Sequence, residues 1–436
     1  MFTTYEEAVD WIHARLRLGI KPGLKRMEWM MERLGNPERK LKSVHIGGTN
    51  GKGSTVTFLR SILQAGGYTV GTFTSPYIEQ FNERISVNGT PISDEEVLQI
   101  TNVILPLANE LEETELGGPT EFEVVTAMSF YYFSEIHPVD MVLFEVGLGG
   151  RFDSTNIITP LLSIITNIGL DHTNILGNSY EEIAFEKAGI IKADKPVFTA
   201  VKQPEALKVI EEQAEKMKAP LFRINQEFSV ENHTSLPFGE SFSLNTSDFG
   251  SIKTLETKMI GKHQTENAAL AVMASLYLNQ NNVLSINDQN IRDGLKVAFW
   301  PGRFEVISEN PFVIIDGAHN NEGVSALTHE LSSRFHGKQI HIVFTALKDK
   351  ALNNMIERLD EIANKITFVT FDYPRATEAV ELFEMSHSKN KTVGADWEAS
   401  ITEELQNLPK DHVLVITGSL YFISLVKPFL LKYFEK

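Results

Sequence analysis

The sequence contains no cysteine among its 436 residues. This absence excludes a disulfide framework and any metal site built from thiolates. No apolar run comes near the roughly 20 residues that a membrane-spanning helix needs, so we expect no membrane partner. The N-terminal stretch MFTTYEEAVDWIHARLRLG also lacks the charged-then-apolar order of a secretory signal, because acidic residues and arginines interrupt it. We therefore expect a cytoplasmic protein.

Positive charge is scarce as well. The chain has 40 Lys and Arg against 57 Asp and Glu, which gives a net charge of -17 at pH 7. A general nucleic-acid-binding protein needs clustered Lys and Arg for its phosphate contacts, so this balance argues against a nucleic-acid partner. The net charge still allows a small anionic ligand, because a local cluster of donors can override the field of the whole protein.

At 436 residues the chain is longer than one hydrophobic core supports, so two domains are expected. Short apolar runs alternate with helical patterns through its first part, which is typical of a parallel α/β sheet. Between residues 228 and 259, short alternating segments predict a small antiparallel sheet. The other strands expected in this part are 43–48, 68–73, 140–146, 161–168 and 196–200, and the helices are 52–65, 95–112, 122–136, 180–191, 205–218 and 264–278.

A second α/β block is expected to begin near Trp300, where the sequence FWPGR interrupts the pattern. Its expected strands are 311–316, 339–346, 366–372 and 412–417, and its helices are 323–335, 352–363 and 420–431. The predicted fold class is therefore α/β. We expect a P-loop domain over residues 1–297, with a mostly parallel sheet and a small antiparallel one, and a smaller Rossmann-like α/β domain over residues 298–436.

The strongest chemical motif is a glycine-rich turn between an expected strand and an expected helix. Such a turn directs backbone N–H groups and a helix N-terminus at phosphate, and its lysine adds a positive charge. It departs from the common G-x-x-x-x-G-K-[ST] pattern, because Ile46 stands at the first glycine position and Gly53 follows the lysine. The expected nucleotide-binding residues of the turn are Gly48, Thr49, Asn50, Gly51, Lys52, Gly53 and Ser54.

The form GTNGKGS is found in the folylpolyglutamate synthases and, with Thr in place of Gly53, in the related Mur peptide ligases. By motif, the chain resembles the folylpolyglutamate synthases over residues 40 to 320, including the bifunctional bacterial members that are also dihydrofolate synthases. The resemblance implies an ATP-dependent, amide-forming ligase. It would add L-glutamate to the γ-carboxylate of a folate, and in bifunctional members to dihydropteroate, through an acyl phosphate. ATP and two Mg²⁺ ions are implied, and a monomer is the default of the family.

Two residues at expected strand ends are candidates for binding Mg²⁺. Glu145 ends an apolar run and begins the sequence EVGLGG, and a carboxylate there is costly unless a cation pairs with it. A strand-end salt bridge is the alternative that the residues alone leave open. The resemblance makes Ser75, in the turn Thr74-Ser75-Pro76, a second Mg²⁺ ligand, although such a turn by itself is usually structural.

A third cluster, NIGLDH, ends in His172 and is followed by Lys187 in EKAGI. A neutral imidazole can bind a second divalent cation. The resemblance makes Lys187 a lysine that reacts with CO₂, and the resulting carbamate is an anionic oxygen ligand for Mg²⁺. Taken alone, the lysine fits an exposed helical position and the histidine an ordinary polar one. The catalytic set implied by the resemblance is Lys52, Glu145, His172 and Lys187.

The resemblance also extends to the acceptor substrate. The segment FNERI resembles the loop over the folate site, which implies folate contacts for Phe81 and Arg84. The sequence RFD resembles the RLD form of many bifunctional members, although Phe152 replaces its leucine. This implies that Arg151 and Asp153 contact dihydropteroate.

Four further positions match nucleotide-binding positions of the family. Asn267 lies in the helix expected at 264–278, three residues after the pair His263-Gln264, and Arg303 lies in PGRFE. The planar fork of an arginine suits it to phosphate oxygens. Asp316 and His319, in the strand end DGAH, resemble residues on the ATP ribose and glutamate side of the site. This set predicts that the nucleotide lies between two domains.

Two other functions stay open from the sequence. A Mur-type ligase acting on a UDP-sugar peptide is disfavoured by Gly53 and by the segment FNERISVNG. A P-loop switch that hydrolyses nucleotide to control a partner is disfavoured because the sequence has no NKxD motif and because a second α/β block would serve no purpose. Dependence of turnover on glutamate and a folate acceptor distinguishes the ligase from the switch.

Overall fold

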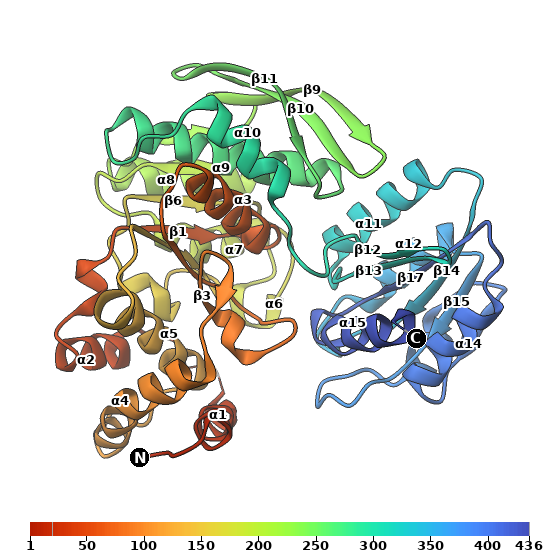
Figure 1. Cartoon of the computed structure of the whole chain (residues 1–436), viewed down its shortest axis with the longest axis horizontal. Helices are drawn as coiled ribbons and strands as arrows, with labels where there is room; N and C mark the ends of the chain where they lie inside the picture. Colours follow the sequence, from red (N-terminus) through yellow and green to blue (C-terminus); the bar gives the residue numbers. More distant parts are fainter. Residues whose placement is uncertain (20, 436) are drawn as a thin grey trace.

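The computed structural model describes residues 1–19 and 21–435, which form two α/β units (Figure 1). The main sheet of the first unit has eight strands, six of them parallel and two antiparallel at one edge. Its central strands are buried on both faces, and the strand that ends at Glu145 is accordingly apolar up to that residue. In order across the sheet the strands are β4 (Thr90–Pro91), β3 (Ile85–Val87), β2 (Val70–Phe73), β5 (Met141–Glu145), β1 (Ser43–Gly47), β6 (Leu162–Ile165), β7 (Val197–Thr199) and β8 (Leu221–Arg223).

Helices cover both faces of this sheet. One face packs against α3 (Lys52–Ala65), α9 (Lys262–Gln280) and α10 (Asp288–Val297). On their outer side lies a three-stranded antiparallel sheet, β9 (Phe228–Leu236), β10 (Gly239–Thr246) and β11 (Gly250–Thr257). The other face packs against α1 (Tyr5–His13), α2 (Lys25–Arg33), α4 (Asp94–Glu112), α5 (Glu121–Tyr131), α7 (Tyr180–Lys187) and α8 (Pro204–Lys216).

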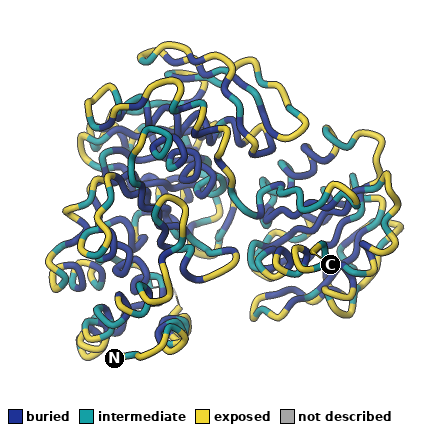
Figure 2. The backbone as a smooth tube through the Cα atoms, viewed as in Figure 1, coloured by how far each residue is buried: buried dark blue, intermediate teal, exposed yellow. Residues whose placement is uncertain are grey.

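The second unit is a six-stranded sheet with helices on both faces. The sheet runs β12 (Glu305–Glu309), β13 (Phe312–Asp316), β17 (His412–Thr417), β14 (Gln339–Phe344), β15 (Lys365–Phe368) and β16 (Lys391–Val393), with only β12 antiparallel to its neighbour among them. Its helices are α11 (Asn321–Arg334), α12 (Leu352–Ile362) and α13 (Ala379–Met385) on one face, and α14 (Trp397–Asn407) and α15 (Leu420–Phe434) on the other. Figure 2 shows that buried residues, in dark blue, run through the interior of both units, where the sheets lie.

The predicted fold class is confirmed, and the differences are local. The helix expected at 122–136 ends at Tyr131 and continues as a π-helical turn, and the strand expected at 366–372 ends at Phe368. Amphipathic helices α1, α2, α10 and α14 were not predicted. We propose that the two units meet between the end of α10 at Val297 and the start of β12 at Glu305. Within residues 1–19 and 21–435, the helices are too short or too polar to cross a membrane.

Candidate active site

The glycine-rich turn joins β1 to α3 at the carboxyl end of the parallel strands. Two of its glycines are required by space and backbone shape. Gly48 has φ +139° and Gly51 has φ +84°, and an added Cβ would collide with Thr166 at the first and with Asn267 at the second. Lys52, the first residue of α3, donates from Nζ to the carbonyls of Gly48 and Thr49, each at 3.2 Å. The turn therefore presents a lysine and a helix N-terminus to the cleft, as a phosphate site requires.

Glu145 is a buried carboxylate with a free oxygen. It ends β5, and its Oε1 lies 4.0 Å from Lys52 Nζ while its Oε2 has no hydrogen-bond partner. Burial raises the pKa of Glu145 to about 7, although Lys52 and Arg303 oppose this rise. Ser75, in the turn after β2, lines the same cavity between the two units as Glu145 does. A buried carboxylate with an unpaired oxygen is costly, so this corner of the cleft is suited to a cation.

Asp171, in the loop after β6, connects the two units. Its Oδ1 accepts a hydrogen bond from Lys350 Nζ at 2.6 Å, and its Oδ2 accepts one from Asn320 at 3.1 Å and lies 3.8 Å from His319 Nε2. Burial alone would raise the pKa of Asp171, but Lys350 and His319 outweigh it and hold the pKa well below its usual range. The next residue, His172, also lines the cavity, and burial lowers the pKa of its imidazole. His172 is therefore neutral at pH 7, the form that binds a metal.

Lys187 is the last residue of α7 and lies beneath the P-loop rather than on the surface. Only 4% of it is exposed, and its Nζ donates to the Gly48 carbonyl at 3.0 Å. Burial, together with the charge of Lys52, lowers the pKa of Lys187 to about 7. About half of its amines are therefore neutral and nucleophilic near pH 7.

The second unit closes the cavity with residues from its own strand ends. Asp316, the last residue of β13, accepts from the amides of Phe304 and Ala318 at 2.7 and 2.8 Å and so supports the loop that carries Arg303. Burial and the charge of Lys350 lower the pKa of His319 to about 4. Its Nδ1 donates to the Gly317 carbonyl at 2.7 Å, which leaves Nε2 as an acceptor at neutral pH.

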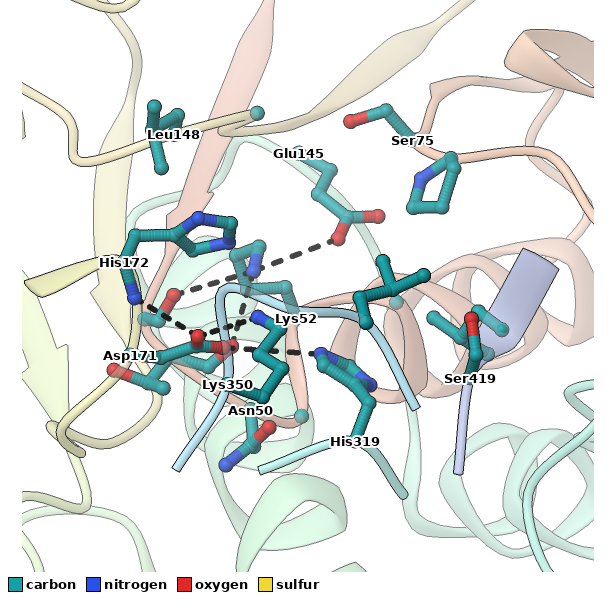
Figure 3. A pocket seen from close by; sticks show the side chains of 18 of the residues that line it. Asn50, Lys52, Ser75, Glu145, Leu148, Asp171, His172, His319, Lys350 and Ser419 are labelled. Carbon is teal, nitrogen blue, oxygen red and sulfur yellow. Dashed lines mark hydrogen bonds and ion pairs between the residues drawn. The ribbon is translucent and has the colours of Figure 1, made fainter. Parts of the chain in front are cut away.

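These groups surround a cavity of about 160 Å³ between the two units. Figure 3 shows Glu145 and Ser75 on one side, His319, Lys350 and Asp171 on another, and Lys52 between them. The predicted site residues that line it are Gly48, Thr49, Asn50, Gly51, Lys52, Gly53, Ser75, Glu145, His172, Lys187, Arg303 and His319.

Three predicted nucleotide residues lie behind this lining. Ser54 is buried in the first turn of α3, Asn267 packs against Gly51, and Asp316 supports the loop before β12. Their predicted contacts with nucleotide stay predictions.

The predicted folate residues lie outside the cavity lining. Arg84 pairs with Glu121 at 2.9 Å and lies 5.8 Å from the ring of Phe81. Arg151 donates to the Phe185 carbonyl at 2.8 Å and stacks on the Phe185 ring. Asp153 accepts from the Leu148 amide at 2.9 Å and caps the turn that follows it. The predicted contacts of these four residues with folate or dihydropteroate stay predictions.

Several cleft residues were not selected from the sequence. Asp171 follows β6, and the others follow strands of the second sheet: Lys350 after β14, Arg375 after β15, and Ser419 and Tyr421 after β17. All follow the carboxyl ends of parallel strands, where α/β sheets bind ligands. Polar residues after each predicted strand were the signal that could have identified them.

Two protein families match the two units separately. Residues 46–275 match the Mur ligase middle domain, and residues 302–420 match the glutamate ligase domain of Mur ligases. The gap between the matches, residues 276–301, contains α10 and the start of the segment that joins it to β12.

Relatives of known activity match nearly the whole chain. The chain is 53% identical over 424 residues to the dihydrofolate synthase/folylpolyglutamate synthase of Bacillus subtilis, covering 97% of this chain and 98% of that protein. It is 34% identical over 429 residues to the folylpolyglutamate synthase of Lacticaseibacillus casei, covering 98% and 99%.

Solved structures match both units together. The Mycobacterium tuberculosis folylpolyglutamate synthase complexed with ADP superposes with a TM-score of 0.90 at 28% identity, over 98% of each chain. A folylpolyglutamate synthase complex with AMPPCP and folate superposes with a TM-score of 0.87 at 34% identity, over 98% of this chain and 100% of the other.

Proposed function

Because the chain belongs to the folylpolyglutamate synthase and dihydrofolate synthase family of Mur ligases, we propose that the cleft between its units is where ATP activates a carboxylate for attack by glutamate. The enzyme is an ATP-dependent ligase that joins L-glutamate to a folate through an amide bond. The observation that carries the placement is that Lys52 of the first unit and His319 and Lys350 of the second line one cavity.

The first step is formation of an acyl phosphate, because a carboxylate oxygen is too poor a leaving group for direct amide formation. An oxygen of the folate γ-carboxylate attacks the γ-phosphorus of ATP, the bond to the β–γ bridging oxygen breaks, and ADP leaves with that electron pair. Lys52, the P-loop amides and Arg303 stand around the cavity and compensate the charge of the transferring phosphoryl group.

The second step is attack of the glutamate amine on the acyl carbon. The tetrahedral intermediate then collapses, the carbon–oxygen bond to phosphate breaks, and the nitrogen loses a proton. His319 is neutral at pH 7, because burial lowers its pKa to about 4, so its Nε2 can accept a hydrogen bond from the amine. Contact between the two units keeps water from the acyl phosphate, which would otherwise hydrolyse.

Magnesium fits this cleft. The buried Glu145 has an oxygen without a partner, and Ser75 lines the same cavity, so these two residues would hold one ion. Within the part of the chain that is described, no three His, Cys, Asp or Glu side chains come together as a metal site. A site with only two protein ligands, Glu145 and Ser75, suits an ion whose remaining ligands are water and ATP phosphates. Bound there, Mg²⁺ would neutralise charge on the β- and γ-phosphates.

A carbamate on Lys187 would supply an anionic oxygen for a second ion, with His172 as a further ligand. Carbamate formation needs a neutral amine: Nζ attacks the carbon of CO₂, a nitrogen–carbon bond forms, and the nitrogen releases a proton to water. Lys187 meets this requirement because its pKa is lowered to about 7 by burial. The extent of carbamate formation should therefore rise as pH increases through about 7.

The carbamate predicts a specific resonance. With ¹³C-labelled bicarbonate at pH 8, the enzyme should show a carbamate carbon signal that is absent from Lys187→Arg, since arginine stays protonated. Lys192→Arg is the matched control, because burial lowers the pKa of that lysine to about 8 and it lies outside the cavity lining. A signal that survives in Lys187→Arg would place the carbamate elsewhere, and no signal in the unaltered enzyme would exclude it.

We also propose that Phe81 and Arg84 contact the folate acceptor and that Arg151 and Asp153 serve dihydropteroate as a second acceptor. The dual name of the Bacillus subtilis relative supports the second acceptor. The protein would act as a cytoplasmic monomer on ATP, L-glutamate and these acceptors, with no nucleic-acid or membrane partner. Its net charge of -17 supports the absence of a nucleic-acid partner.

Labelled glutamate tests the activity and the range of acceptors. We expect ATP-dependent incorporation into tetrahydrofolate and into dihydropteroate when each is supplied alone, and loss of both in Lys52→Ala. Incorporation into tetrahydrofolate alone would restrict the enzyme to polyglutamate synthesis. Hydrolysis of ATP without incorporation into either acceptor would contradict the proposed reaction.

A further inference from the structure

Helix α11 of the second unit touches the P-loop at its N-terminal end. Its cap residue Asn320 exchanges two side-chain hydrogen bonds with Asn50, at 3.2 and 3.0 Å, and donates a third to Asp171. In the first turn, Glu322 accepts from the Leu170 amide at 3.2 Å. This end of α11 is therefore fixed to the two loops of the first unit that line the cavity.

The C-terminal end of α11 is fixed to the first unit by a buried arginine. Arg334 donates to the carbonyls of Leu236 and Gly239 at 2.6 and 3.2 Å, and it forms an ion pair with Glu240 of β10. Its Nε also donates to Glu330, one turn earlier in α11, at 3.0 Å. Side-chain exposure is 9% for the arginine and 0% and 5% for the two glutamates, so the network is almost dry.

The two glutamates that Arg334 joins also cap helix α9. Gly261 has no side chain to cap this helix, and its amide donates to Glu240 at 2.7 Å while the Lys262 amide donates to Glu330 at 3.0 Å. Carboxylates satisfy the free amides of a helix N-terminus and its positive end. Glu240 belongs to the first unit and Glu330 to the second. The capping of α9 therefore depends on the position of the second unit, which Arg334 links to Glu240.

Helix α9 leads back to the P-loop. Asn267, in its second turn, packs against Gly51, next to the Asn50 that Asn320 contacts. An α-helix of 14 residues is about 21 Å long and stiff. Helix α11 is thus attached to the first unit at both ends. Its N-terminal end contacts the P-loop directly at Asn50, and its C-terminal end is linked through α9 to Gly51. In Figure 1, α11 lies between the body of the second unit and the sheet of β9 to β11.

We propose that Arg334 is a positioning residue: through Glu240, Glu330 and helix α11 it sets the orientation in which the second unit faces the P-loop. Its consequence for turnover rests on the proposed function, because His319 and Lys350 line the cavity in that orientation. Lysine cannot replace it fully, since a single ammonium lacks the planar fork that reaches several acceptors at once.

The orientation can be measured directly because the chain has no native cysteine. Spin labels at Gln99→Cys on α4 and Gln406→Cys on α14, both exposed positions, report the distance between the units by double electron–electron resonance on the full chain. We expect one narrow distance distribution for the labelled parent and a broadened or displaced one after Arg334→Met. Arg223→Met is the matched control, because Arg223 pairs with Glu211 and Glu227 within the first unit, and it should leave the distribution unchanged.

The ratio of ATP consumed to amide formed gives a second reading, which a merely structural arginine would not affect. In Arg334→Met we expect amide formation to fall about tenfold to a hundredfold, as for small misplacements of reacting groups, and more ATP to be consumed per amide formed. A purely structural loss would lower both rates together. If Arg334→Met does not fold, Arg334→Lys and Glu240→Gln replace it, with a smaller broadening expected. An unchanged distribution with an unchanged ATP-to-amide ratio would overturn the proposal, and absence of glutamate incorporation in the parent would contradict only the proposed function.

Discussion

Replacement of Lys52 by alanine should lower kcat for glutamate addition by about 10²- to 10³-fold, which is the usual loss when one preorganised donor to a developing charge is removed. Lys52 Nζ is held over the P-loop by two carbonyls at 3.2 Å and has Glu145 at 4.0 Å. In the proposed reaction its charge would lie where negative charge spreads over the transferring phosphoryl group. Steady-state rates with saturating ATP, glutamate and tetrahydrofolate measure the effect.

Two variants show whether the loss belongs to this position. Lys208→Ala removes an exposed lysine of α8 that lies 4.0 Å from Glu212, and it should leave kcat unchanged. Lys52→Arg keeps the charge but changes its shape, so it should recover only part of the rate. If Lys52→Ala retained kcat within about threefold of the parent, Lys52 would not face the γ-phosphate.

Replacement of Glu145 by glutamine should lower activity and raise stability at alkaline pH. Activity should fall by about 10²- to 10³-fold, because the variant loses the carboxylate that we propose holds Mg²⁺. The Mg²⁺ concentration for half-maximal activity should rise as well. A magnesium titration of the residual activity measures this shift, and an unchanged requirement would argue against Glu145 as a ligand.

The gain in stability follows from the raised pKa of Glu145, about 7 in the folded protein against 4.5 for the free side chain. Between these values the unfolded chain ionises while the folded one keeps its proton, so the contribution of this group to stability falls as pH rises. Without added metal, Glu145→Gln should therefore gain up to about 3 kcal/mol above pH 7 and nothing below pH 4. Thermal unfolding at pH 4, 6 and 8 in a chelator measures this dependence.

Glu404 of α14 offers a contrast outside the cleft. Burial alone would raise its pKa, but hydrogen bonds from His341 and Lys365 outweigh this and lower the pKa to about 2. Its contribution to stability is present above pH 4.5 and is lost as pH falls towards 2. Glu404→Gln should accordingly destabilise the protein at pH 8, opposite to Glu145→Gln. The same sign for both variants would show that the effect of Glu145→Gln is not electrostatic.

Local sequence patterns were sufficient to predict the helices and strands whose signals lie within a short stretch of the chain. The helix expected at 52–65 is α3, and the strand expected at 43–48 is β1, because a buried parallel strand, a glycine turn and a helix start each have a short-range signature. The small antiparallel sheet was likewise visible in alternating segments between residues 228 and 259. Helices α10 and α14 were missed although their faces are amphipathic, since they follow segments rich in polar turn residues.

By itself, then, the sequence determined two α/β units and a glycine-rich turn between a buried strand and a helix. Only the tertiary structure decided which distant groups meet. Lys350 and Asp171 stand 179 positions apart and form an ion pair across the two units, a contact that depends on the orientation of the units and so has no local pattern. Lys187 stands in the polar helical sequence YEEIAFEK, yet packing beneath the P-loop buries it and lowers its pKa to about 7. Burial is a property of the assembled fold, and here it shifts the pKa of a lysine whose local sequence is ordinary.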